Sequence, residues 1–144
     1  MLKIVRRCER CADDEKVRGL TLSFEERRKS RQRVRLDDGR EAGLALPRGT
    51  VLRHGDVLEA EDGTRIEVRA SAERLSLVQC PEPAGLARLC YHLGNRHQSV
   101  QIEGNRVCYP ADPVIDAMVA GLGHNILAVT AAFEPECGAH HHHG

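Results

Sequence analysis

The chain has 144 residues, of which 41% are hydrophobic, 29% are charged and only 3% are aromatic. This composition is typical of a globular protein with one or two small domains and an aliphatic core, and it argues against a disordered chain. The formal charge is zero, which gives no support to nucleic-acid binding, because that function needs a clustered basic surface. The chain lacks both an apolar leader and an apolar run long enough to span a bilayer, so we expect a cytoplasmic protein.

Short strands separated by turn residues are expected throughout residues 1–70. Runs of alternating polar and apolar residues flank Asp38-Gly39 and again Asp62-Gly63. An Asp-Gly turn between two such runs predicts a β-hairpin. The hairpin strands are expected at residues 32–36 with 41–46 and at 56–61 with 64–69, two outer strands at 2–7 and 19–22, and one helical turn within 23–30. We therefore predict a small all-β domain.

Residues 71–133 follow a mixed pattern of strand and helix signals. A strand is expected at 73–80, a helix from Pro83 to a stop at Gly94-Asn95, a hairpin at 100–103 and 107–109, a helix from Pro113 to Gly121 and Gly123, and a strand at 125–133. The order β-α-β-β-α-β predicts a ferredoxin-like sheet with both helices on one face. The whole chain is thus expected to be α+β, with residues 134–144 forming a flexible tail that contains histidines.

His97 is the strongest single candidate for a metal ligand. It follows the first predicted helix of the second domain, where the carbonyl end of the helix favours positive charge and a loop exposes the imidazole. One imidazole cannot hold a metal ion tightly, but two chains that pair across a two-fold axis could share an ion between two copies of His97. The alternative is a surface histidine with a structural hydrogen bond.

Four consecutive histidines, His140, His141, His142 and His143, lie near the end of the chain. Clustered imidazoles on a flexible segment can capture nickel, copper or zinc, and Cys137 is close enough in sequence to add a thiolate. The alternative is a purification-tag remnant, although four histidines followed by glycine is shorter than the usual tag.

The remaining histidines and cysteines are weaker candidates. His92 lies beside the apolar face of the predicted helix and is expected to be packed. Cys8 and Cys11 have C-x-x-C spacing, but a zinc ribbon needs a second such pair and none exists. Cys80, Cys90 and Cys108 fall on predicted strands or helix and are expected in the core.

Several segments can be compared with a known family: the stretch His92-Leu93-Gly94-Asn95-Arg96-His97, then Asp112-Pro113-Val114 with the helix that runs on to Gly123, and the histidine-rich end. In these segments the chain resembles the UreE-type urease accessory proteins, which are nickel metallochaperones. The resemblance implies a homodimer joined through the ferredoxin-like domains, with Ni²⁺ bound across the dimer axis by His97 and auxiliary ligands from His140 to His143. It also implies that residues 1–70 bind a peptide or partner. The ion would pass to apo-urease with a UreG-type GTPase and the other accessory proteins.

Two features depart from the family pattern, and other functions remain open. Residues 105–109 lack the histidines that some members carry after the motif, and the tail is short, so we expect one or two ions per dimer. The main alternative is a peptide- or partner-binding module in which binding of copper or zinc is secondary. A hydrolase that uses Asn95, Arg96 and His97 around an anion is a third hypothesis, but the sequence shows no nucleophile motif and no acid pair, so we do not expect an enzyme.

Overall fold

The computed structural model describes residues 1–9 and 17–136. The chain divides into two compact units, of which the first comprises Met1–Ser71 and the second begins at Ala72. The first unit is rich in strands, the second combines four strands with two helices, and the predicted α+β class is therefore confirmed. Among the described residues, no helix has the length and apolar character needed to cross a bilayer.

The first unit contains both predicted hairpins. Its elements are β1 (Leu2–Cys8), β2 (Arg18–Leu22), α1 (Phe24–Arg27), β3 (Arg31–Arg35), β4 (Glu41–Ala45), β5 (Val57–Ala60) and β6 (Arg65–Ala70). β3 pairs with β4 and β5 with β6, both antiparallel, and the turn glycines Gly39 and Gly63 have φ of +92° and +89°. Glycine adopts these positive φ angles without a Cβ clash, which is why Asp-Gly predicts both turns.

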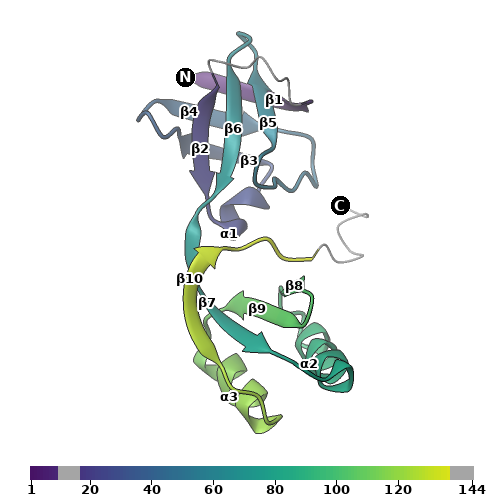
Figure 1. Cartoon of the computed structure of the whole chain (residues 1–144). Coiled ribbons are helices and arrows are strands. Elements are labelled where there is room, and N and C mark those ends of the chain that lie inside the picture. Colours follow the sequence, from purple (N-terminus) through teal and green to yellow (C-terminus); the bar gives the residue numbers. More distant parts are fainter. Residues whose placement is uncertain (10–16, 137–144) are drawn as a thin grey trace. The chain divides into compact units, whose positions relative to one another are not determined.

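The expectation that residues 2–7 form an outer strand is wrong. The strand order is β2-β6-β5-β1-β4-β3, so β1 lies inside the sheet, parallel to β4 and antiparallel to β5 (Figure 1). β1 buries Leu2 and Ile4 in an aliphatic core, with Ile4 fully inaccessible to solvent. These pairings join residues far apart in sequence, so local alternation predicts the strand but not its neighbours.

The two edge strands of this sheet, β2 and β3, are joined at one end by Asp37. The Asp37 amide donates to the carbonyl oxygen of Gly19 at 2.9 Å, and its carboxylate accepts from the amide and hydroxyl of Thr21 at 3.1 and 3.0 Å. A Cβ at position 19 would lie 2.4 Å from Asp37 Oδ2, so a larger residue there would force the Asp37 side chain to move. The sheet is therefore curled towards a barrel, with β2 and β3 on either side of its seam.

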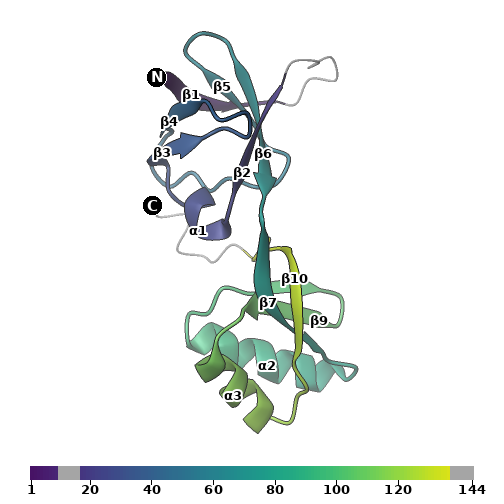
Figure 2. The same ribbon diagram turned by 90° about the vertical axis from the view of Figure 1, so that its left-hand side faces the viewer.

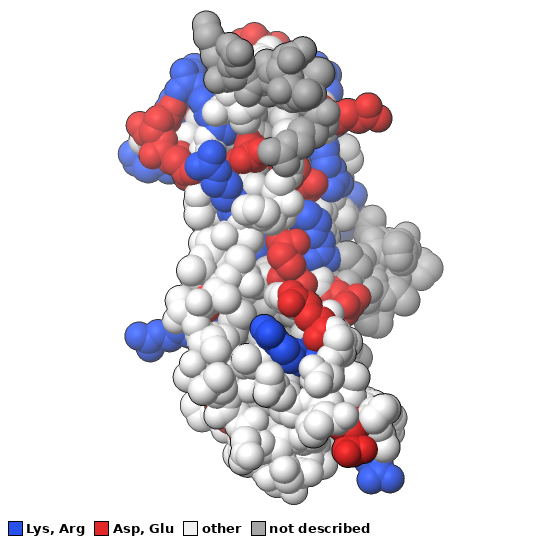
Figure 3. All heavy atoms as spheres, viewed as in Figure 1, with Lys and Arg blue, Asp and Glu red and all other residues white. Residues whose placement is uncertain are grey.

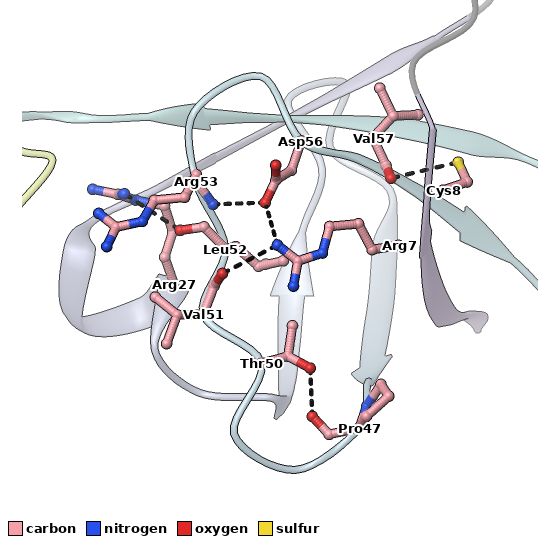
Figure 4. Close-up of polar contacts among 10 residues, drawn as sticks. All are labelled: Arg7, Cys8, Arg27, Pro47, Thr50, Val51, Leu52, Arg53, Asp56 and Val57. Atoms are coloured by element: carbon pink, nitrogen blue, oxygen red, sulfur yellow. Dashed lines mark hydrogen bonds and ion pairs between the residues drawn. The ribbon is translucent and has the colours of Figure 1, made fainter. Parts of the chain in front are cut away.

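Side chains from β1 and α1 hold the long connection between β4 and β5 in place (Figure 4). Arg7 Nη1 donates to Val51 O and to Asp56 Oδ2 at 3.4 and 3.0 Å. The buried Arg27 donates from Nη1 to Leu52 O at 3.5 Å, and its guanidinium lies 5.5 Å from the Phe24 ring centre. Carbonyl oxygens thus satisfy a charged group that would be costly to bury alone.

The second unit has the predicted ferredoxin-like topology. Its elements are β7 (Ala72–Gln79), α2 (Pro83–Asn95), β8 (Gln101–Glu103), β9 (Arg106–Pro110), α3 (Pro113–Gly121) and β10 (Leu127–Ala132). The antiparallel sheet has the order β10-β7-β9-β8, and α2 and α3 cover one face of it (Figure 2). The core contains Leu89 and Leu93 of α2, Ile115 and Val119 of α3, and Val78, Val107 and Tyr109 of the sheet.

A buried polar network joins α3 to this sheet. The hydroxyl groups of Ser76 on β7 and Tyr109 on β9 both donate to Asp116 Oδ1 at 2.7 Å. Asp112 caps the same helix by accepting from the amides of Val114 and Ile115. These bonds fix where α3 begins and how it lies on the sheet.

Candidate metal site

The end of α2 places His97 in an unusual backbone conformation. The His97 amide donates to Gly94 O at 2.9 Å and the Gln98 amide to Leu93 O at 3.0 Å. This pair of bonds is a Schellman motif, in which the residue after the C-cap adopts a left-handed conformation. Here the C-cap is Arg96 and the left-handed residue is His97, with φ of +57°. The helix ends at Asn95, so the predicted stop at Gly94-Asn95 is confirmed, but the left-handed residue after it is His97 rather than a glycine.

The end of α3 provides an internal comparison. It closes with the same two bonds, from Gly123 N to Ala120 O at 3.0 Å and from His124 N to Val119 O at 3.4 Å. The left-handed position there is Gly123, with φ of +94°. A side chain at such a position costs about 1 kcal/mol relative to glycine. His97 thus occupies a site where glycine would be more stable, and a strained residue of this kind points to a role for its side chain.

His97 lies on the surface of the second unit. It is exposed, as are Gly94, Asn95 and Arg96 before it. It follows the point where the carbonyl groups of α2 end, and the partial negative charge at a helix C-terminus favours a bound cation. The neighbouring guanidinium of Arg96 contacts α3, with Nη1 3.6 Å from Met118 Sδ.

The described residues of one chain do not form a complete metal site. Within residues 1–9 and 17–136, no three His, Cys, Asp or Glu side chains come together in a way that could hold an ion. Transition metals bound by proteins usually have three or four protein ligands. Any tight site at His97 therefore needs ligands beyond the described residues of one chain.

The outer face of α2, which leads to His97, has little charge. Its exposed residues include Ala84, Ala87, Tyr91 and Gly94, with Arg88 as its charged member, and the Tyr91 side chain is 66% exposed. A Cβ at position 94 would meet nothing within 4 Å. In the view of Figure 3, charged side chains gather over the strands of the first unit, whereas the second unit shows few. Sequence reasoning predicts this helix but not which of its faces stays uncovered, because that depends on how the helix packs on the sheet.

After β10 the chain bonds to residues that follow His97 in sequence. Phe133 is fully buried, the Glu134 amide donates to Gln101 Oε1 at 2.8 Å, and the Glu136 amide donates to Val100 O at 2.7 Å. Val100 is three residues beyond His97 in sequence. The proposed ligands His140, His141, His142 and His143, together with Cys137, lie outside the described residues.

The other histidines of the second unit are packed against its own residues. His92 is half-buried, and its ring lies edge-on to the ring of Tyr91 with the centroids 5.2 Å apart. His124 Nδ1 lies 3.9 Å from Cys80 Sγ. Both contacts account for these side chains without a metal ion.

Burial disfavours three of the described cysteines as metal ligands. Desolvation raises the pKa of Cys80, Cys90 and Cys108 and so disfavours the thiolate form that metals bind. Cys80 is buried as expected, but Cys90 and Cys108 are only half-buried. In the first unit, Cys8 Sγ lies 3.4 Å from Val57 O (Figure 4), while Cys11 is outside the described residues.

Comparison with known proteins identifies both units. Residues 2–71 match the model of the UreE urease accessory protein N-terminal domain, and residues 73–144 match that of the C-terminal domain. The chain is 51% identical over 121 residues to a urease accessory protein UreE of Alkalilimnicola ehrlichii, an alignment that covers 84% of this chain and 74% of the relative. Identity is 49% to the UreE of Ralstonia nicotianae, covering 87% of this chain and 61% of that protein, and 48% to that of Proteus mirabilis, covering 84% and 75%. The chain therefore belongs to the UreE family of urease accessory proteins.

Proposed function

We propose that this protein is a nickel metallochaperone, which binds Ni²⁺ as a homodimer and delivers it to apo-urease during assembly of the urease active site. Membership of a urease accessory family supports the urease part of this proposal. It also fits a non-enzyme, since an accessory protein acts on the maturation of the enzyme. Nickel is cargo in this role, so the site must bind the ion and then release it.

The observation that carries the proposal is the histidine at the left-handed C-terminal position of α2. The imidazole is exposed, it follows the negative end of a helix, and it occupies a position where α3 has glycine. A residue that lowers stability in order to present a ligand is expected at a functional site. Neutral imidazole is also a preferred ligand of nickel, copper and zinc.

A two-fold dimer would bring together ligands from two chains. If the outer faces of two α2 helices pair, each His97 lies near its counterpart and the two can share one ion. Tyr91 would contribute apolar contact area, and the open space beside Gly94 would allow close approach of the two helices. A shared ion with few ligands is also easier to release than one in a closed cage.

The histidines near the end of the chain can complete the coordination. Glu136 is bonded beside Val100, and four further residues span at most about 14 Å when fully extended. That reach supports His140, His141, His142 and His143 as auxiliary ligands around His97. Together with the short length of the histidine run, it supports a capacity of one or two ions per dimer.

We assign partner binding to residues 1–70, metal binding and dimerisation to residues 71–133, and auxiliary ligation to residues 134–144. The partners we propose are a UreG-type GTPase, the urease accessory complex and apo-urease, all in the cytoplasm. Imidazole ligands also accept Cu²⁺ and Zn²⁺, so we assign nickel from the family rather than from the ligand chemistry.

Calorimetric titration with NiSO₄ tests the metal site. We expect the wild-type protein to bind about one tight Ni²⁺ per dimer and His97→Gly to lose that tight binding. His92→Ala is the matched control, since it removes an imidazole from the same helix and should leave tight binding intact. Unchanged tight binding in His97→Gly would exclude this site.

Delivery to urease needs a separate measurement. Apo-urease and the other accessory proteins, supplied with nickel-loaded protein as the only metal source, should gain urease activity with the wild type but not with His97→Gly. Metal-free and nickel-loaded protein should differ in this assay. If both recover the same partners in pull-downs and give the same urease activity, the protein is instead a partner-binding module in which metal binding is secondary.

A further inference from the structure

The free edge of β3 presents three arginines in succession. Leu36 N donates to Arg40 O at 2.8 Å and Leu46 N to Ser30 O at 3.0 Å, so the even-numbered residues of β3 exchange hydrogen bonds with β4. Opposed residues of an antiparallel pair alternate between bonded and non-bonded types. Arg31, Arg33 and Arg35 therefore turn their amide and carbonyl groups away from β4. Within residues 1–9 and 17–136, no strand pairs with that side of β3.

The side chains of the same three residues share the outer face of the sheet. Val34 is buried in the core and Gln32 is half-buried, whereas Arg31, Arg33 and Arg35 are exposed. Arg35 has a carboxylate partner in Glu41, 3.3 Å away. Arg31 and Arg33 have no carboxylate partner within the described part of the chain. This surface, which we call the arginine edge, thus combines unpaired backbone groups with cationic side chains.

A cleft lies beside the arginine edge. It has a volume of about 330 Å³, and its lining includes Arg33 and Arg35 of β3, Thr21 and Leu22 of β2, and the acidic residues Glu26 and Glu41. The Asp37 contacts close the seam between the two strands at one end. On β4, the residues paired with Arg33 and Arg31 are Gly43 and Ala45, which add at most a methyl group to this face.

We propose that the arginine edge binds an extended acidic segment of a partner protein by β-strand addition. The segment pairs through its backbone with Arg31, Arg33 and Arg35, and carboxylates at every second position lie opposite the guanidinium groups. Main-chain bonds supply affinity, and the charge complementarity selects an acidic sequence. This inference specifies the partner surface of the first unit and does not depend on the nickel site.

Nuclear magnetic resonance of the full-length protein tests the proposal with a capped nonapeptide that has glutamate at alternate positions and threonine or valine between them. Binding should shift the amide signals of Arg31, Arg33 and Arg35 and slow their hydrogen exchange at least about tenfold, since these amides gain a partner. The amides of Gln32 and Val34 already bond to β4 and should change little. Shifts spread over the surface without these three amides would overturn strand addition.

Altered peptides and proteins separate strand addition from general charge attraction. A lysine version of the peptide should not bind, and a version with proline between the glutamates should bind at least about tenfold more weakly, because proline cannot donate a main-chain bond. The double variant Arg31→Glu with Arg33→Glu should lose at least about tenfold in affinity, while Arg74→Glu, a charge reversal in the second unit, should not.

The proposal would be contradicted if the proline peptide bound as tightly as the original peptide, or if the double variant bound the peptide as tightly as the wild type. The role of the arginines would then be to protect an edge strand against aggregation. Nickel binding by the same double variant should match the wild type. Failure of this inference is therefore distinguishable from failure of the nickel proposal.

Discussion

The amide nitrogen of Glu136 lies 2.7 Å from the carbonyl oxygen of Val100, three residues beyond His97. This bond fixes the point from which the rest of the chain continues, and that point is close in sequence to the candidate ligand. A histidine run that began at a distant surface could not serve the same ion. The bond therefore holds Glu136, four residues before His140, beside Val100, three residues after His97.

Removal of residues 138–144 should lower nickel stoichiometry or affinity while the dimer persists. The deletion takes away the auxiliary imidazoles but keeps the Glu136–Val100 bond and the outer face of α2. Calorimetry with NiSO₄ and sedimentation velocity measure the two properties on the same samples. Replacement of His140, His141, His142 and His143 by serine is the matched control, since it keeps chain length and should have the same effect. Loss of the dimer on truncation would contradict the assignment of dimerisation to residues 71–133.

His97→Gly should make the protein more stable even though it removes the proposed ligand. Glycine adopts a φ of +57° without the Cβ clash that a histidine has, so we expect a gain of up to about 1 kcal/mol in the free energy of unfolding. Urea denaturation of metal-free protein measures this change. The mirror variant Gly123→Ala should lose about 1 kcal/mol at the corresponding position of α3.

A destabilised His97→Gly would give the opposite conclusion. It would mean that the imidazole makes contacts that the fold depends on, and that His97 is a structural residue. The combination of higher stability and lost nickel binding is therefore specific to a functional ligand.

Gly94→Gln should weaken dimerisation without unfolding the chain. Position 94 is helical and open in one chain, so a glutamine there fits the isolated unit and improves helix propensity. In a dimer that pairs along α2, the same side chain would occupy the space needed by the partner. Gly121→Gln is the control, because Gly121 is also helical and a Cβ added there would likewise meet nothing within 4 Å. Equal dimer dissociation constants for both variants would place the dimer contact elsewhere.

Tyr109→Phe tests the polar network that holds α3 on the sheet. Burial, together with the hydrogen bond to Asp116 and the charge of its carboxylate, raises the pKa of Tyr109 above its ordinary value near 10. The unfolded chain then binds fewer protons than the folded chain once the pH exceeds about 10, so stability should fall as pH rises through that range. Tyr109→Phe should remove this part of the pH dependence and cost about 1–3 kcal/mol at neutral pH.

Urea denaturation between pH 7 and 11 measures both effects. Tyr91→Phe is the control, because the Tyr91 side chain is 66% exposed and its loss of a hydroxyl should change neither property. If the free energy of unfolding of Tyr109→Phe falls between pH 7 and 11 as much as that of the wild type, titration of other groups causes the fall.

Local signals predict the elements of both units well. The Asp-Gly turns before Arg40 and Thr64 and the Asp112-Pro113 helix start are each decided by a few adjacent residues, and the structure confirms them. The order of helices and strands in the second half is enough to identify the ferredoxin-like sheet.

Features that depend on distant residues could not be predicted. The inner position of β1 and the contact of Asp37 with Gly19 join segments whose pairing no local pattern encodes. The predicted end of α2 at Gly94-Asn95 is confirmed, but glycine is the usual left-handed residue at a helix end, so the sequence does not predict that His97 takes this conformation. The proposed tail ligands are outside the described residues and stay a prediction.

Native mass spectrometry of the nickel-loaded protein tests the central claim most directly. The account predicts one tightly held Ni²⁺ in a dimer of wild-type chains, none in a dimer of His97→Gly chains, and intermediate retention in a mixed dimer with one imidazole. Nickel held by a monomer, or held equally by all three dimers, would contradict it.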